Sequence, residues 1–377
     1  MKTFIRLFVL FSPILGAGCK PVTSRAISYA GSQISDLTYE TAPTSEALVV
    51  VEPTPTGSAP QANEIVKPSP TAIQQAAPSE PPLRFTLPTP GPAPKSLWRP
   101  PLYPTPWGLG PNDHFFFSRP IGADEVNWPE PDYRYGGIFF SSDIVHTGVD
   151  IPARMKTPVI AAGDGRVVWA GFGLFYGNDD ENDPYGKAVA IEHTFGFKGQ
   201  KVYSIYAHMD RIDVVKGQDV KTGDQVGIIG VTGFTTGPHL HFEVRTDKNS
   251  FFTTYNPELW LAPPQGWGVL VGRIMKSDGS LLYHHALVAE NNETGQEWTV
   301  MSYGNSVVHP DPYYNENLVL SDLPAGTYTL TVEFEDEEYI SEIEIRPGAV
   351  TYFTYQGEKG YRFDLPADPT IASMVAP

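Results

Sequence analysis

Residues 146–171, HTGVDIPARMKTPVIAAGDGRVVWAG, decide how the middle of this chain folds. The stretch opens with His146 and Asp150, four residues apart, and continues through short segments rich in valine, isoleucine and alanine. Glycine and aspartate separate these segments, a pattern typical of short strands joined by tight turns. The stretch therefore predicts β-structure that begins beside two side chains able to bind a metal ion.

The strand pattern extends in both directions over residues 111–264, with almost no helical periodicity. Residues 157–168 and 218–230 echo one another, because each reads as a strand, a Gly-Asp turn and a second strand. The expected fold class is therefore all-β, with a duplicated, barrel-sandwich-like β-hybrid domain in this region.

A second β-rich region covers residues 268–357. It contains roughly seven short strands with frequent turns, which favours an immunoglobulin-like β-sandwich. Residues 323–332, LPAGTYTLTV, resemble prealbumin-like or carboxypeptidase-regulatory-like domains, and residues 358–377 are expected to form a tail. The histidines of this region have no carboxylate at metal-ligand spacing and are expected on the surface: His284, His285 and His309.

The first 19 residues have the layout of a secretory signal, with basic residues, an apolar run over residues 7–15 and then small residues. The run ends at Cys19 in LGAGC, which resembles the bacterial lipobox except that Gly16 stands where leucine is preferred. We therefore expect an exported protein of the cell envelope or extracellular space, with a membrane tether if Cys19 is lipidated. Because Cys19 is the only cysteine, no internal disulfide can form.

Residues 20–110 are polar and then rich in proline, and 17 of the 37 prolines of the chain lie between Pro53 and Pro111. Such a segment buries too little apolar surface to fold, so we expect a disordered linker that is partly polyproline II. The formal net charge of the chain is -17, with no basic cluster to offset it. This charge argues against nucleic acid as a partner.

Three further histidines belong to the predicted all-β domain. His239 and His241 lie two residues apart in GPHLHFEVR, so on a strand their side chains project from the same face. His208 ends another strand pattern in YAHMD. A catalytic zinc takes three protein ligands and leaves one position for water, and imidazole and carboxylate are suitable donors.

The motifs HTGVDI, YAHMD and GPHLHFEV, in this order, resemble those of the lysostaphin-like zinc endopeptidases that cut peptidoglycan peptides. The resemblance implies that His146, Asp150 and His241 bind one zinc ion per chain. It also implies that His208 and His239 line the reaction centre, where one accepts a proton and the other stabilises the oxyanion. We favour His239 as the base. The expected activity is hydrolysis of peptidoglycan peptides by zinc-activated water.

Three alternatives remain at this point. Some relatives have lost their metal ligands and act as silent wall-binding proteins or activators of other hydrolases, but here all five residues are present. A biotinyl or lipoyl carrier domain has similar strands but needs a lysine at a hairpin tip, whereas Lys156 follows the metal motif. A related zinc carboxypeptidase would use the same ligands. The scissile bond and the oligomeric state cannot be predicted.

Two stretches depart from the family pattern. Residues 117–145 replace a short Gly-Phe-Gly segment, and residues 171–186 form an acidic insertion. Both are candidate walls of a substrate groove. For the acidic insertion, a solvated loop and a calcium site are the alternatives.

Overall fold

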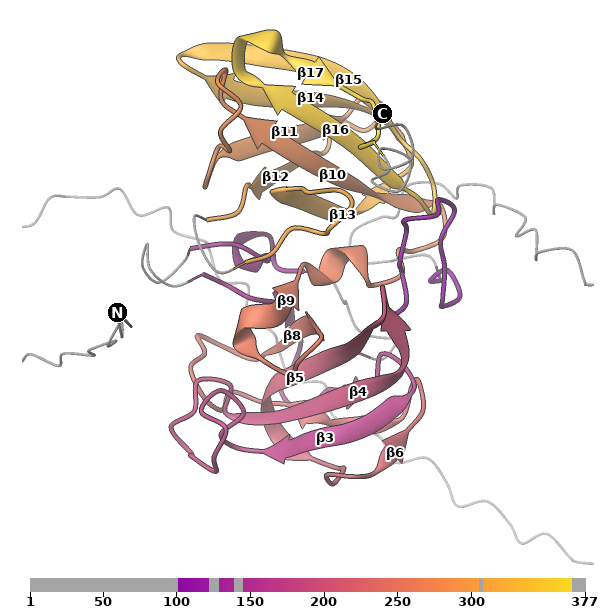
Figure 1. Ribbon diagram of the computed structural model, residues 1–377, viewed down its shortest axis with the longest axis vertical. Helices are drawn as coiled ribbons and strands as arrows, with labels where there is room; N and C mark the ends of the chain where they lie inside the picture. The colour runs from indigo at the N-terminus through magenta and orange to yellow at the C-terminus, as the bar shows by residue number, and fades with distance from the viewer. Residues whose placement is uncertain (1–100, 122–128, 139–144, 305–307, 368–377) are drawn as a thin grey trace, which may run out of the picture. The chain divides into compact units, whose positions relative to one another are not determined.

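The computed structural model describes residues 101–121, 129–138, 145–304 and 308–367 (Figure 1). The predicted signal peptide, Cys19 and most of the predicted linker lie outside these residues. Within the described ranges, no helix is long and apolar enough to cross a membrane. The helical elements found there are short 3-10 turns: η1 (Pro131–Tyr133), η2 (Phe251–Thr253), η3 (Pro257–Leu259) and η4 (Gly357–Lys359).

The first β-region is a nine-stranded sheet in which every pairing is antiparallel. Its main path runs β1-β8-β5-β4-β3-β6, while β7 pairs with β2 and β5, and β9 pairs with β8. The strands are β1 (Val149–Pro152), β2 (Pro158–Ile160), β3 (Gly165–Gly171), β4 (Lys187–Phe197), β5 (Gln200–Ile212), β6 (Asp219–Val220), β7 (Gln225–Ile229), β8 (His239–Thr246) and β9 (Thr254–Tyr255). This confirms the all-β prediction for the region.

The two echoing stretches of sequence pair with each other. Strand β2 pairs with β7, and β3 pairs with β6, so each half of one unit meets the opposite half of the other. The turns also interlock, since Thr222 donates its backbone N–H to the Asp164 carboxylate at 2.8 Å. This arrangement agrees with the predicted duplicated unit.

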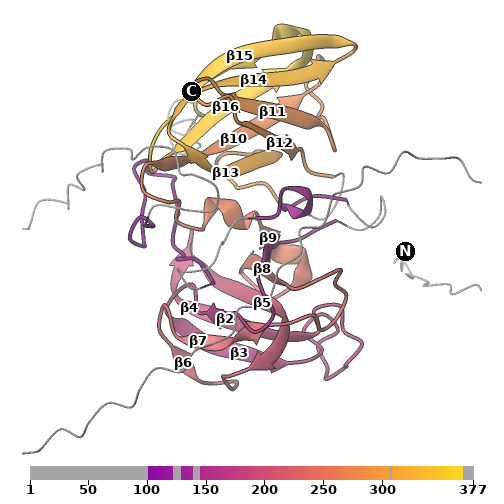
Figure 2. The same cartoon turned by 180° about the vertical axis from the view of Figure 1, so that it is seen from behind.

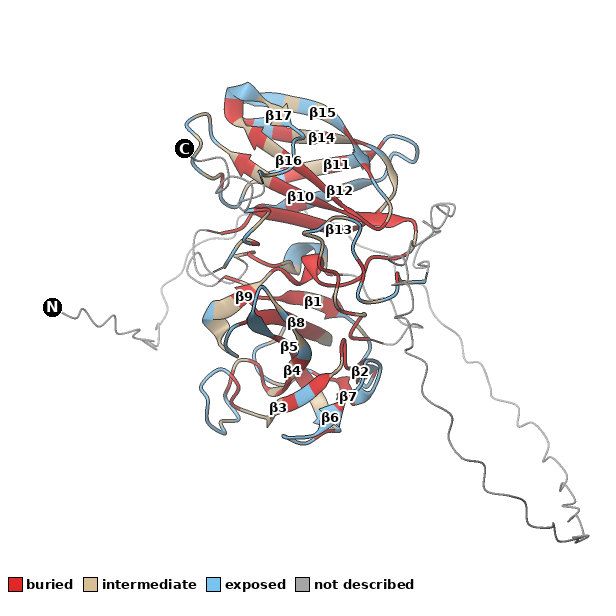
Figure 3. Ribbon diagram, turned by 45° about the vertical axis from the view of Figure 1, so that its right-hand side comes forward, coloured by how far each residue is buried: buried red, intermediate tan, exposed pale blue. Residues whose placement is uncertain are grey.

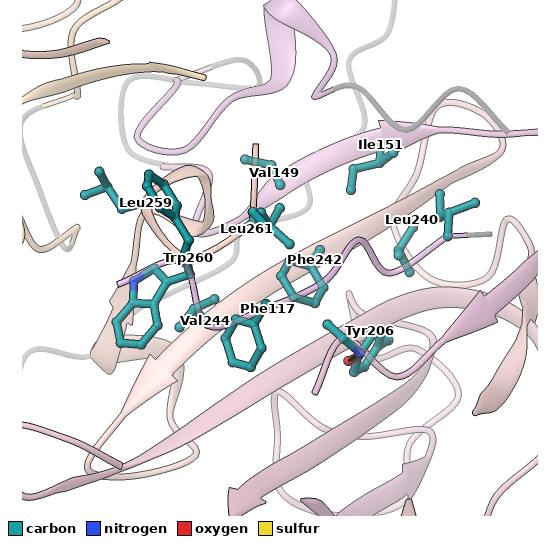
Figure 4. Close-up of a cluster of buried hydrophobic side chains, with 14 of the residues drawn as sticks. Phe117, Val149, Ile151, Tyr206, Leu240, Phe242, Val244, Leu259, Trp260 and Leu261 are labelled. Carbon is teal, nitrogen blue, oxygen red and sulfur yellow. Dashed lines mark hydrogen bonds between the residues drawn. The ribbon is translucent and has the colours of Figure 1, made fainter. Parts of the chain in front are cut away.

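Alternation along β1 and β8 separates an apolar face from a polar face. Leu240, Phe242 and Val244 enter the core, as do Val149 and Ile151 of the neighbouring strand (Figure 4). The intervening positions of β8 carry the polar side chains: His239, His241, Glu243 and Arg245. The period of the strands thus brings the polar residues of both strands to one side.

The second β-region has two four-stranded sheets that share an apolar core, as a β-sandwich does. One sheet has the order β13-β10-β16-β17 and the other β12-β11-β14-β15, and β10 runs parallel to β16. In Figure 3, buried residues line much of β10, and exposed ones are frequent on β15. The strands are β10 (Trp267–Met275), β11 (Ala286–Asn291), β12 (Glu297–Met301), β13 (Leu318–Pro324), β14 (Gly326–Phe334), β15 (Glu337–Ile345), β16 (Val350–Gln356) and β17 (Tyr361–Arg362).

Residues 101–110, which we expected in the linker, are packed against the folded regions. Tyr103 and Trp107 are buried and stack at 4.3 Å between ring centroids. The indole N–H of Trp107 donates to the Gly348 carbonyl at 2.7 Å. The linker prediction is therefore wrong for this end, because two aromatic rings supply the apolar surface that the neighbouring prolines lack.

Candidate metal centre

Three side chains converge where β1 meets β8. Asp150 of β1 is paired directly with His241 of β8, and His146 lies four residues before Asp150. His146 Nε2 lies 3.0 Å from Asp150 Oδ1 and 3.0 Å from His241 Nδ1, and the last two atoms are 2.9 Å apart. Among the described residues, this is the one group of histidine, cysteine and acidic side chains placed to hold a metal ion.

The outer nitrogen of each imidazole faces a group that can only accept a hydrogen bond. His146 Nδ1 lies 3.2 Å from the Arg134 carbonyl oxygen, and His241 Nε2 lies 3.0 Å from Glu243 Oε1. We therefore infer that the outer nitrogens carry the protons. When the rings are neutral, as metal binding requires, the inner nitrogens then have lone pairs that face Asp150 Oδ1.

This arrangement fits a tetrahedral divalent metal ion. Three acceptor atoms this close repel one another unless a cation lies between them. Bonds of about 2.0–2.2 Å to a tetrahedral zinc place neighbouring ligand atoms about 3.3–3.6 Å apart. The separations of 2.9–3.0 Å in this centre are a few tenths of an ångström shorter, so small side-chain shifts would admit the ion.

The charges around the centre also favour a cation. Burial alone would raise the pKa of Asp150, but the neighbouring His146 and His241 outweigh it and hold the pKa well below its usual range. Burial alone would lower the pKa of His241, but Asp150 and Glu243 outweigh it and raise the pKa to about 9. A raised histidine pKa means that the surroundings stabilise positive charge, which a metal ion can supply in place of a proton.

Glu243 and Arg245 support this centre, although the sequence analysis did not predict them as site residues. The Glu243 side chain is fully buried, and its Oε1 accepts from Thr147 Oγ1 at 2.5 Å and from Tyr185 Oη at 2.6 Å. Arg245 Nε donates to Glu243 Oε2 at 2.7 Å. The alternation of HLHFEVR was the available signal, because it places Glu243 and Arg245 on the same face as His241.

His208 and His239 lie beside the three candidate metal ligands. The ring centroid of His208 is 4.8 Å from that of His239 and 5.7 Å from that of His241. Each ring directs Nδ1 to a backbone carbonyl, His208 to Thr232 at 2.8 Å and His239 to Gly237 at 2.9 Å. Because a carbonyl only accepts, Nδ1 of His208 carries the proton and its Nε2 has the lone pair. For His239 the shorter contact, at Nδ1, favours the same tautomer, although its Nε2 also lies 3.3 Å from Asp150 Oδ2.

Burial keeps these two imidazoles neutral at neutral pH. It lowers the pKa of His208 to about 3 and also lowers the pKa of His239. His208 has a left-handed backbone, with φ of 61°, at the point where β5 leaves β8 and joins β7. Its N–H donates to the Tyr185 carbonyl at 2.9 Å, so neighbouring structure holds this unfavourable conformation.

A pocket of about 180 Å³ opens beside Asp150 and His239. The segment before His146 contributes Glu130 and Tyr133 to its wall, and residues 236–238 contribute the opposite side. The Glu130 N–H donates to the Asp150 carbonyl at 2.8 Å, which attaches this segment to β1. Part of the stretch that departs from the family pattern therefore borders the centre.

The other histidines singled out in the sequence do not join the centre. His193 is also outside the centre: it is buried, and its Nε2 lies 2.7 Å from Ser204 Oγ. His285 and His309 contact backbone carbonyl groups instead. The carboxylates of residues 171–186 form no metal-binding group among the described residues, so nothing favours a calcium site there.

Two histidines and one aspartate lie together here, with the pocket and the imidazoles of His208 and His239 beside them. They form the ligand set of a metal-dependent hydrolase. Residues 144–252 match the family model described as Peptidase family M23. The chain therefore contains an M23 peptidase domain, in agreement with the family expected from the sequence motifs.

Several known proteins are similar to this region. The chain is 38% identical over 102 residues to the peptidoglycan DD-endopeptidase ShyB of Vibrio cholerae, a match that covers 27% of this chain and 20% of ShyB. It is 36% identical over 118 residues to the lipoprotein NlpD/LppB homolog of Pseudomonas aeruginosa, covering 31% and 35%. The solved catalytic domain of lysostaphin from Staphylococcus simulans is 29% identical with a TM-score of 0.30, covering 34% of this chain and 89% of that domain. The match thus spans about a fifth of the length of ShyB.

Proposed function

We propose that this protein is a zinc metalloendopeptidase that hydrolyses peptide bonds in the cross-links or stem peptides of peptidoglycan. The observation that carries the proposal is the convergence of three possible metal-ligand atoms, from His146, Asp150 and His241, beside a pocket lined by His239. The similarity to ShyB over 102 residues supports the substrate class.

In this proposal, His146, Asp150 and His241 hold one zinc ion per chain. When bound, zinc supplies a Lewis acid that lowers the pKa of a water molecule and polarises a peptide carbonyl. Glu243 accepts the Nε2 proton of His241 and thereby fixes the tautomer that directs Nδ1 to the centre. Arg245 in turn holds the Glu243 carboxylate in place.

His239 is our candidate for the general base. It lines the pocket, and its Nδ1 proton is held by the Gly237 carbonyl, so Nε2 can accept a proton from the attacking water. The same nitrogen can then donate that proton to the leaving amine. His208 has the same tautomer, so stabilising an oxyanion would require a second proton on its ring, which burial opposes. We therefore place His208 as a second basic imidazole beside His239.

A catalytically silent wall-binding or hydrolase-activating protein is the second candidate function. The similarity to a protein named as an NlpD/LppB lipoprotein homolog supports it. The complete set of ligand atoms favours the enzyme, because a binding protein has no need of three metal-ligand atoms held about 3.0 Å apart.

We further propose that the protein acts in the cell envelope or outside the cell, with peptidoglycan peptides as partners. The names of two similar proteins, a peptidoglycan endopeptidase and a lipoprotein, support this location. A membrane tether through lipidated Cys19 remains a prediction.

The test is the release of new amino groups from purified peptidoglycan by the full chain, after removal of metal and after return of zinc. We expect release that depends on zinc and falls by more than about 100-fold in His241→Ala, since even residues that only support a ligand cost 10–100-fold. His284→Asn, at an exposed histidine, is the matched control and should keep full activity. Tight binding of one zinc per chain without any amino-group release would favour the activator instead.

A further inference from the structure

Four aromatic side chains gather on the surface of the M23 domain: Phe175, Tyr176, Phe251 and Phe252, here called the aromatic platform. Phe175 is 41% exposed, Tyr176 55% and Phe252 62%, which is unusual for side chains of this size. The rings meet edge to face, with centroids 5.3 Å apart for Phe175 and Tyr176, 5.1 Å for Phe175 and Phe251, and 5.4 Å for Phe251 and Phe252. An exposed apolar patch of this kind usually marks a binding surface.

Two segments far apart in sequence build the platform. One is the acidic insertion, residues 171–186, drawn in magenta between β3 and β4 (Figure 1), and the other is the turn η2. Figure 2 shows the same insertion from behind. The side chains therefore come together only in the folded protein.

Buried groups hold both segments in place. The Asp183 carboxylate is fully buried and accepts the backbone N–H groups of Phe175 at 2.8 Å and Tyr176 at 3.1 Å. On the other side, Arg245 donates to Asn249 Oδ1 at 2.7 Å, just before η2. Because the backbone under the rings is fixed before binding, little conformational entropy is lost when a ligand settles on them.

The platform lies next to the metal centre. The Tyr185 ring stands between them, with its centroid 6.2 Å from that of Phe175 and 5.7 Å from that of His241. The Tyr185 hydroxyl also donates to Glu243 at 2.6 Å. The platform is therefore separated from a metal ligand by one buried aromatic ring.

The polar rim of the platform indicates what kind of molecule it takes. Residues 171–186 contain no lysine or arginine, and their exposed polar side chains are amides and carboxylates, including Asn178, Asp179, Glu181 and Asn182. Beside η2, the exposed Lys248 is offset by the exposed Asp247, so the acidic insertion leaves the rim negative. Such a rim disfavours anionic lipid surfaces and nucleic acid. A neutral polymer with hydroxyl and amide donors, and with flat apolar faces to lie on the rings, matches both parts of the surface.

We propose that the aromatic platform binds the glycan strand of peptidoglycan, a polymer of N-acetylated pyranose rings, and so presents the attached peptide to the metal centre. The identity of the polymer rests on the proposed function. The platform would act through substrate binding and would take no part in the chemical step.

Binding can be tested without cleavage. The probe is a soluble tetrasaccharide of β-1,4-linked N-acetylglucosamine, titrated into the metal-free full chain by calorimetry. We expect the double substitution Tyr176→Ala with Phe252→Ala to weaken binding about tenfold, since each aromatic contact contributes about 0.5–1.5 kcal/mol. Phe363→Ala, at an aromatic residue 45% exposed in the sandwich region, is the matched control and should bind as the wild type does.

A second measurement separates the platform from the proposed activity. With intact peptidoglycan, the double substitution should raise KM about tenfold and leave kcat unchanged. With a sugar-free cross-linked stem peptide, neither constant should change. If the wild type bound the tetrasaccharide but cleaved neither substrate, the proposed function would fail and the platform would stand.

Three results would contradict the proposal that the platform binds glycan, without contradicting the proposed peptide cleavage. The first is a wild type that does not bind the tetrasaccharide at millimolar concentration. The second is a double substitution that binds it as tightly as the wild type. The third is self-association through these residues that the sugar does not displace.

Discussion

Two sets of buried polar side chains in this protein differ in what they can do. Around His241, atoms from β1 and β8 direct lone pairs at one point that borders a pocket. Where the nine-stranded sheet meets the sandwich, Arg119 pairs with Asp322 and Arg134 pairs with Glu258. Each charge in this second set, here called the junction set, faces an opposite charge.

The contrast between these two sets indicates which buried charged groups mark a functional site and which only stabilise the fold. A donor that faces an acceptor is satisfied and needs no further partner, whereas several acceptors that face one another need a cation. Arg134 belongs to both sets, because its side chain pairs with Glu258 and its carbonyl lies 3.2 Å from His146 Nδ1. The junction set should therefore govern folding, and the set around His241 should govern metal binding.

The largest expected effect is on the junction set. Arg119→Met leaves the Asp322 carboxylate without its buried partner, and removing one partner of a buried pair costs about 3–5 kcal/mol. We expect the free energy of unfolding, measured in urea, to fall by this amount. The zinc affinity of the folded protein should not change.

The exposed pair Arg166 and Asp219 provides the control for this comparison. Arg166 Nε lies 2.8 Å from Asp219 Oδ1, but the two side chains are 62% and 71% exposed. Arg166→Met should leave the free energy of unfolding unchanged. A loss of zinc affinity in Arg119→Met would contradict the separation of the two sets.

The next effect concerns the set around His241. Glu243→Gln keeps the size of the side chain but removes the charge that accepts from His241 Nε2. We expect zinc affinity, measured by competition with a chelator, to fall about 10–100-fold, as for other supporting residues of metal sites. Cobalt substituted for zinc reports the ligand geometry through its visible spectrum. If both the zinc affinity and the cobalt spectrum were unchanged, Glu243 would have no role in supporting the metal centre.

The smallest expected effect is a pH dependence of the free energy of unfolding that arises from the buried Glu316. Burial and the nearby Asp311 raise the pKa of Glu316 to about 8, from a usual value of 4.5. The folded state therefore holds this proton more tightly than the unfolded state does. The resulting stability is complete below pH 4.5 and is lost as the pH rises toward 8.

We expect this loss to be about 1.4 kcal/mol per pH unit near pH 6.5 and about half of that at pH 8, where Glu316 is half ionised in the folded state. Glu316→Gln keeps a neutral side chain at this position and should flatten the dependence. Urea unfolding of both proteins over this range measures the difference. Equal slopes in the two proteins would show that Glu316 ionises in the folded state as it does in the unfolded chain.

Most of the correct predictions from the sequence came from the alternation of residues along strands and from the order of the motifs. The all-β class and the duplicated unit followed from runs of β-branched residues between Gly and Asp turns, and the His239 and His241 pair followed from the period of a strand. Glu243 was missed because a single glutamate on a strand is usually solvated, and only packing shows that this one is buried under His241. Tyr103 and Trp107 were missed because proline-rich composition outweighed two aromatic residues that find partners far along the chain.

By itself the sequence determined the kinds of ligand atoms and the strands that carry them, because side-chain chemistry and the two-residue period are local properties. Tertiary structure alone decided that Asp150 stands opposite His241, since register between strands 91 residues apart depends on packing of the whole sheet. Tertiary structure also decided which ring nitrogen of each histidine carries the proton when the ring is neutral. The Arg134 carbonyl and the Glu243 carboxylate direct the lone pairs of His146 and His241 inward, and no local pattern places those two groups beside the rings.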